Sequence, residues 1–203
     1  MSIKKISLAF ISLWVFALAL PAQSGQEIIN REIFILDQES PFSVSMNIPS
    51  RWRAETQPGI NLPLMERTFN IRLDLPSGEK AVLIITIGQT ALGGPISGRD
   101  PISLEQFNQL AESRVSALMP YAVEDRAIFH DVIIPNGYAR YSTITDASLV
   151  DKVIPPNEYL YLTMYFANYE NGSFVFASYL SDHMEDNNFA LMLDLLASME
   201  FFM

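Results

Sequence analysis

The chain has 203 residues, no cysteine and a formal charge of −10 at pH 7. The absence of cysteine excludes disulfides, thiolate metal sites, thiol nucleophiles and a lipidated N-terminal cysteine. The negative charge disfavours binding to nucleic acid and to anionic lipid headgroups, since both are negatively charged themselves.

The first residues have the pattern of a secretory signal. Lys4 and Lys5 precede an uncharged run from Ile6 to Leu20, and the small residues of LPAQSG follow. The run is shorter than the roughly 20 residues that a membrane-spanning helix needs. We therefore expect residues 1–24 to be a cleaved signal and residues 25–203 to form one domain. The expected location is periplasmic or secreted, with no stable membrane span after signal cleavage.

Strand patterns dominate the first half of the expected domain. Residues 42–48 alternate apolar and polar side chains, which predicts a half-buried strand that Pro49 ends. Trp52 stands between two arginines just beyond, and we expect its ring to plug the open end of the core. Residues 66–75 and 80–88 flank the turn-rich segment PSGE and predict a hairpin.

A long loop and a helix follow. Residues 88–102 contain four glycines and two prolines, without the spacing of a phosphate-binding loop. Long loops on a rigid sheet often carry binding function, so we expect Gly93, Gly94 and Arg99 to contact a partner. Ser103 and Gln106 match a capping box that starts a helix. The apolar stripe of this helix comprises Leu104, Phe107, Leu110, Ala111, Val115 and Leu118.

The second half reads as two more hairpins and a terminal helix. Residues 126–134 and 138–145 flank the turn PNG, and residues 158–169 and 173–180 flank the turn ENG. The apolar stripe of the last helix comprises Phe189, Met192, Leu193, Leu196 and Met199. Consecutive hairpins require antiparallel pairing, and the two helices must cover the sheet. The sequence thus predicts an α+β fold, with about six to seven antiparallel strands sandwiched by α-helices.

Four sequence features together resemble one known family over residues 40–202. FSVSMNIPSRW is similar to the F-x-I-x-I-P-x-x-W entry of the Mog1/PsbP-like fold. The helix from Ser103, the hairpin turn at Gly137 and the ending LLASMEFF agree with that family. The resemblance implies an α/β/α sandwich and an accessory or interaction role without enzymatic activity. None of the residues can be matched to the calcium or manganese ligands of PsbP-like proteins.

Local motifs for catalysis and metal binding are absent from the sequence. His130 and His183 are the only histidines, and neither has a second histidine at ligand spacing. HExxH, EF-hand and GxSxG patterns do not occur. We therefore expect no enzymatic activity, no catalytic residue, no metal site and no cofactor.

The strand around residues 159–169 is unusually rich in tyrosine. Tyr159, Tyr161 and Tyr165 are expected to share one face with Tyr169, and an apolar row faces the other way. In one interpretation, a second layer of the fold covers the tyrosine face. In the other, this face is exposed and forms an aromatic shelf for an apolar ligand, a glycan or a partner protein.

These patterns favour a non-enzymatic, exported accessory or interaction module of the cell envelope. Its expected partner is an envelope protein, contacted through the glycine-rich loop and the adjoining sheet face. The first alternative is a carrier of a small apolar ligand that uses the aromatic sheet face, and the second is an uncatalogued hydrolase. The sequence leaves the partner's identity and the oligomeric state open.

Overall fold

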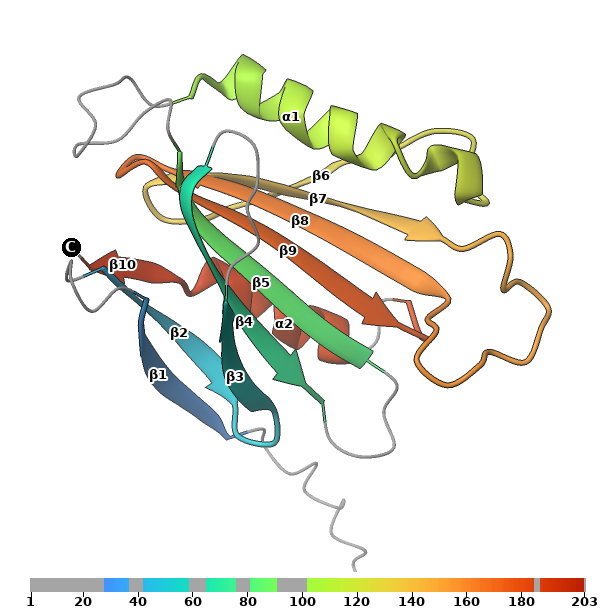
Figure 1. Ribbon diagram of the computed structural model, residues 1–203, viewed down its shortest axis with the longest axis horizontal. Helices are drawn as coiled ribbons and strands as arrows, with labels where there is room; N and C mark the ends of the chain where they lie inside the picture. Colours follow the sequence, from blue (N-terminus) through green and yellow to red (C-terminus); the bar gives the residue numbers. More distant parts are fainter. Residues whose placement is uncertain are drawn as a thin grey trace, which may run out of the picture.

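The computed structural model describes residues 28–36, 42–58, 65–75, 81–90, 102–184 and 187–202. These residues form two antiparallel β-sheets and two α-helices (Figure 1), in agreement with the predicted α+β class. The strands are β1 (Ile29–Ile35), β2 (Ser43–Pro49), β3 (Arg53–Pro58), β4 (Met65–Asp74), β5 (Ala81–Thr90), β6 (His130–Val132), β7 (Gly137–Thr145), β8 (Tyr161–Tyr169), β9 (Ser173–Ser181) and β10 (Glu200–Phe202). The helices are α1 (Leu104–Ser116) and α2 (Asn187–Ala197), and a 3-10 helix spans Met119–Tyr121.

The larger sheet has seven strands within the described residues, in the spatial order β3-β4-β5-β9-β8-β7-β6. All three predicted hairpins are present, as the pairs β4–β5, β6–β7 and β8–β9. β5 and β9 come from different halves of the chain and pair side by side in the middle of the sheet. The strand number falls within the predicted range.

A smaller sheet has the order β1-β2-β10, with β2 in the middle. Val44 of β2 pairs with Phe34 of β1 on one side and with Phe201 of β10 on the other. The sequence predicted a single sheet, whereas the structure has two. This is the main difference between the predicted and the observed fold. Its local cause is the tight turn after Pro49, in which the Trp52 N–H donates to the Pro49 carbonyl and redirects the chain into β3.

α1 lies on one face of the larger sheet, across β7 and β8 (Figure 1). The predicted capping box is confirmed, because the Ser103 hydroxyl accepts from the Gln106 N–H and the Gln106 side chain accepts from the Ser103 N–H. The apolar cluster below the helix comprises Ile102, Phe107, Ala111, Val115, Ile144, Met164, Phe166 and Phe174.

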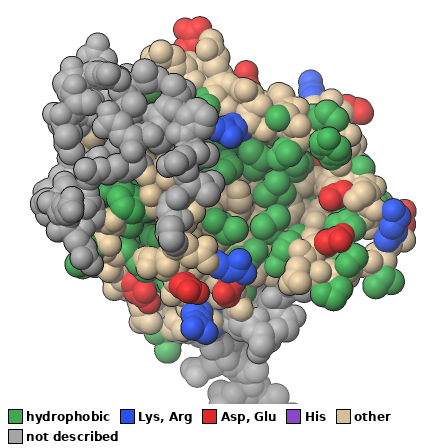
Figure 2. All heavy atoms as spheres, in the orientation of Figure 1, with side chains coloured by type: hydrophobic (Ala, Val, Ile, Leu, Met, Phe, Trp, Pro, Cys, Tyr) green, Lys and Arg blue, Asp and Glu red, His purple; other side chains and the backbone are tan. Residues whose placement is uncertain are grey.

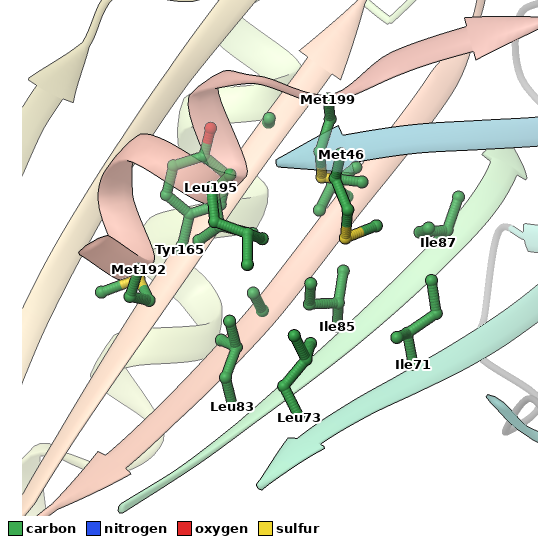
Figure 3. Close-up of a cluster of buried hydrophobic side chains, with 14 of the residues drawn as sticks. Met46, Ile71, Leu73, Leu83, Ile85, Ile87, Tyr165, Met192, Leu195 and Met199 are labelled. Carbon is green, nitrogen blue, oxygen red and sulfur yellow. The ribbon is translucent and has the colours of Figure 1, made fainter. Parts of the chain in front are cut away.

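α2 and the small sheet cover the opposite face of the larger sheet. Met46 of β2 and Leu195 of α2 meet the isoleucines of β4 and β5 there (Figure 3). Phe189, Met192 and Leu196 are buried as predicted, whereas Leu193 is only half-buried. The two helices thus pack against opposite faces of one antiparallel sheet.

Two further predictions need correction. Leu104 belongs to the predicted buried stripe of α1, yet its side chain is exposed, because the start of the helix overhangs a groove beside β6. The strand predicted over residues 126–134 is only three residues long. β10 was not predicted as a strand, since three residues carry too little alternation to be recognised.

Candidate functional site

The structure describes only the tyrosines among the residues predicted to bind a partner. Gly93, Gly94 and Arg99 lie outside the described residues. Tyr161 is half-buried at the start of β8, and Tyr165 is buried at the middle of the same strand. Of these tyrosines, Tyr165 is therefore the one that a partner cannot reach in this structure.

Tyr165 lies in the core between the larger sheet and α2, where its side chain is 1% exposed (Figure 3). Burial raises its pKa and, by the same cause, that of Tyr169. Both hydroxyls are buried without a hydrogen-bond partner among the described residues. Tyr165 and Tyr169 are thus covered by a second layer of the fold. At these two residues, the tyrosine face is not an exposed aromatic shelf.

Tyr159 precedes β8 and influences Arg72 of β4 electrostatically. Arg72 lies beside Ile71 and Leu73, which face the α2 side, and alternation therefore turns Arg72 toward the α1 side. The pKa of Arg72 is raised, first by its hydrogen bond to Asp74. Figure 2 shows apolar side chains gathering on this sheet face below α1.

The outer face of the small sheet exposes a row of apolar side chains. Ile29, Ile33 and Ile35 of β1 alternate along this face, and Phe202 of β10 lies on the same face across β2. Ile33 and Ile35 are 68% and 70% exposed. We call these four residues the β1 surface. Neither described helix covers it, because α2 packs on the inner face of β2.

One polar group interrupts the β1 surface. Arg31 pairs with Glu200 of β10 at 2.6 Å, and the same nitrogen donates to the Ser45 hydroxyl at 2.6 Å. Its other terminal nitrogen donates to the Asn47 side chain at 3.2 Å. Arg31 thus links β1 to β10 across β2. It lies between Ile29 and Ile33 on the same face of β1.

A second candidate site is a groove of about 420 Å³ between α1 and the β6–β7 hairpin. Its walls are mostly apolar, and exposed Leu104 and Ile133 stand at its margin. Its polar side chains are Asn108, Asp131, Tyr138 and Arg140. We call this site the α1–β7 groove.

Arg140 is the cation of the α1–β7 groove. Its Nη1 donates to Asn108 Oδ1 at 2.8 Å, and its guanidinium lies 4.5 Å above the centre of the Phe129 ring. Its Nε lies 3.5 Å from the exposed carboxylate of Asp131, without the geometry of a hydrogen bond. The buried guanidinium is therefore held in place but only partly satisfied by its protein partners.

Gly137 and Tyr138 shape the floor of the α1–β7 groove. A Cβ at Gly137 would come within 2.4 Å of the Asn168 carbonyl oxygen, so only glycine permits this close approach of β7 to β8. The Tyr138 hydroxyl donates to the Ile102 carbonyl and accepts from the Asn168 amide. Burial raises the pKa of Tyr138, which keeps its hydroxyl neutral in these bonds.

A smaller hollow of about 340 Å³ lies between β10 and the turns at Asn136 and Asn171. Its aromatic wall is formed by Tyr169 and Phe201, whose rings meet edge to face at 4.8 Å. This contact packs the end of the small sheet onto the larger one.

Within the described residues, neither histidine belongs to a group that could hold a metal ion. His130 is exposed and stacks on Tyr141 with 5.0 Å between ring centres, and His183 is exposed at the end of β9. Across residues 28–36, 42–58, 65–75, 81–90, 102–184 and 187–202, no three His, Asp or Glu side chains come together as metal ligands would. In the same ranges, no helix has the length and apolar character to cross a membrane.

Sequence reasoning missed both candidate sites. The only local signal for the β1 surface was the alternation of isoleucines in INREIFI, which reads equally well as a buried strand. The α1–β7 groove depends on Asn108 and Arg140, which are 32 residues apart in the chain and meet only in the fold. Comparison with protein-family models, curated proteins and solved structures found no match to this chain.

Proposed function

We propose that this protein is a non-enzymatic interaction module of the cell envelope that binds an extended segment of a partner protein along β1. The observation that carries this proposal is the exposed β1 surface on an edge strand. Exposed apolar patches beside a free strand edge are typical of binding surfaces, because an added strand satisfies the backbone and covers the side chains.

The other edge strands of the two sheets differ from β1. β3 ends the larger sheet with the sequence RAETQP, which is polar and closes with proline. β6 ends the opposite side of the larger sheet, β10 is the other edge of the small sheet, and each has three residues. Natural edge strands are protected from association by short length, charge and proline. β1 has seven residues, three exposed isoleucines and no proline, and its Arg31 is paired with Glu200, so neither short length nor proline protects this edge.

A partner protein fits this edge better than a second copy of the chain. The formal charge of −10 opposes self-association, because two copies would bring together surfaces of the same sign. An antiparallel pair of β1 strands centred on Glu32 would also place two carboxylates opposite each other. An extended apolar segment of another envelope protein meets neither obstacle.

Site-specific cross-linking in cells tests the proposal. A photoreactive residue at Ile33 should give one defined product, and the same residue at Thr56 on the polar strand β3 should not give it. Mass spectrometry should assign the cross-linked site to an apolar, extended segment of an exported protein. A product made of two copies of this chain, or the same bystanders from both positions, would contradict the proposal.

Ile33→Lys provides the matched variant. A lysine on an edge strand blocks strand addition, so the cross-link introduced at Ile35 should be lost in this variant. The Tm should change little, because Ile33 is exposed. Retention of the cross-link at full yield would show that β1 is not the binding edge. The location in the envelope is tested separately, by N-terminal sequencing of the exported protein for loss of residues 1–24.

The carrier alternative finds no support in the tyrosine face, since Tyr165 and Tyr169 are buried. The resemblance to the Mog1/PsbP-like fold stays a prediction, and the proposed function does not depend on it. The proposal instead rests on the exposure and edge position of β1.

A further inference from the structure

We propose that the α1–β7 groove binds a small monocarboxylate with an apolar body. This inference is independent of the proposed function, because the groove lies at the β6 edge of the larger sheet and β1 is an edge of the small sheet.

The bond between Arg140 and Asn108 fixes which atoms remain available. Arginine has only donors, so the Asn108 amide must present its oxygen to the guanidinium, as the 2.8 Å bond shows. The Asn108 Nδ2 group is then left as a pure donor. Neither Asn108 Nδ2 nor Arg140 Nη2 has an acceptor among the described residues. Within the described part of the chain, two donor groups thus lie on one wall of the groove without an acceptor.

The charge around these donors favours an anion. Arg140 carries a full positive charge with a side chain that is 17% exposed. The groove also borders the first turns of α1, whose N-terminal end carries the positive end of the helix dipole. Asp131 is the one carboxylate among the groove's lining residues, and its side chain is 87% exposed. A solvated carboxylate of this kind neutralises a buried guanidinium only weakly.

The walls define the rest of the ligand. Leu104, Phe107 and Ile133 stand beside the donors and offer apolar surface without further polar partners. A carboxylate has two oxygens, which one guanidinium and one amide can satisfy. A phosphate would bring additional charged oxygens against apolar walls at a desolvation cost. The volume of about 420 Å³ lies within the range of small-molecule sites, roughly 300–1,000 Å³.

Titration of the full chain with octanoate, 1-octanol and inorganic phosphate tests this proposal, with amide chemical shifts to locate the binding. Octanoate should bind saturably and shift the amides of Asn108 and Arg140. Octanol should bind at least about tenfold more weakly, since charge-assisted hydrogen bonds are stronger than neutral ones. Equal binding of octanol, or displacement of octanoate by equimolar phosphate, would overturn the proposal.

Asn108→Asp is the decisive variant. It is nearly isosteric and keeps an acceptor for Arg140, so the fold should be retained, but it replaces the amide donors with a negative charge. Octanoate affinity should fall by at least about tenfold. Asn187→Asp makes the same chemical change on α2, at the opposite face of the sheet, and should leave affinity unchanged. Equal affinities of both variants for octanoate would contradict the assignment.

Asp131→Asn provides a second test in the opposite direction. Removing this exposed carboxylate leaves Arg140 without its competing partner and should strengthen octanoate binding by about twofold to fivefold. The gain should shrink as salt concentration rises, because the exposed charge of Asp131 is screened. Weaker octanoate binding to Asp131→Asn would mean that Asp131 does not compete with the ligand for Arg140, which would also overturn the proposal.

Discussion

Trp52 shows how one residue links the two sheets. It follows the turn after β2, is 5% exposed, and belongs to the core cluster shared by the larger sheet, the small sheet and α2. Arg51 and Arg53 on either side are exposed, as the sequence predicted. The Arg51 guanidinium also donates to Asn188 at the start of α2, with 2.8 Å between the atoms. The turn therefore holds three elements together, and its tryptophan is structural.

Trp52→Ala should lower the free energy of unfolding by about 3–5 kcal/mol, because truncation of a buried aromatic ring leaves a cavity. Denaturant unfolding followed by circular dichroism would measure this loss. Arg53→Ala is the control at the neighbouring exposed position and should stay within about 0.5 kcal/mol of the parent. A Tm unaffected by Trp52→Ala would show that the ring does not contribute to the core.

At the scale of elements, Glu124 fastens the segment after the 3-10 helix to the end of β7. Its carboxylate accepts from the Thr145 N–H at 2.9 Å and from the Thr145 hydroxyl at 2.7 Å. Burial acts to raise the pKa of Glu124, but these hydrogen bonds outweigh it and hold the pKa below its ordinary value of 4.5. The chain that leaves α1 is thereby anchored to the larger sheet.

The lowered pKa of Glu124 has a consequence for stability at acid pH. A group whose pKa is lower in the folded state stabilises the fold above its unfolded pKa and loses this effect as pH falls through the folded pKa. The stability difference between the parent and Glu124→Gln should therefore be constant above about pH 5 and shrink below pH 4.5. Denaturant unfolding at several pH values would measure it. A difference that grows on acidification would reverse the assignment.

The elements also show what local patterns can predict. The capping box at Ser103 and the alternation in β2 are contained within short windows, and the structure confirms both. β10 pairs with β2 across more than 150 residues of chain and has only three residues, so no local period could reveal it. The exposure of Leu104 beside the groove likewise could not be read from the periodicity of its own helix.

At the scale of the whole molecule, the α+β class and the hairpins could be predicted, whereas the partition into two sheets could not. Periodicity shows that a strand has an apolar face, but it does not show which layer covers that face. The tyrosines of β8 illustrate this limit, because both covered and exposed arrangements fit the alternation until α2 is placed. The same ambiguity concealed the β1 surface, whose isoleucines lie on the uncovered side of their sheet.

Backbone hydrogen exchange of β1 tests the account most directly. In the free protein, the β1 amides on the open edge should exchange quickly, because no described strand pairs with them there. Addition of the partner segment identified by cross-linking should slow exchange at these amides, while the β3 edge should remain unchanged. The Ile33→Lys variant should show no such slowing. Protection confined to another surface, with the β1 amides still exchanging quickly, would contradict strand addition along β1.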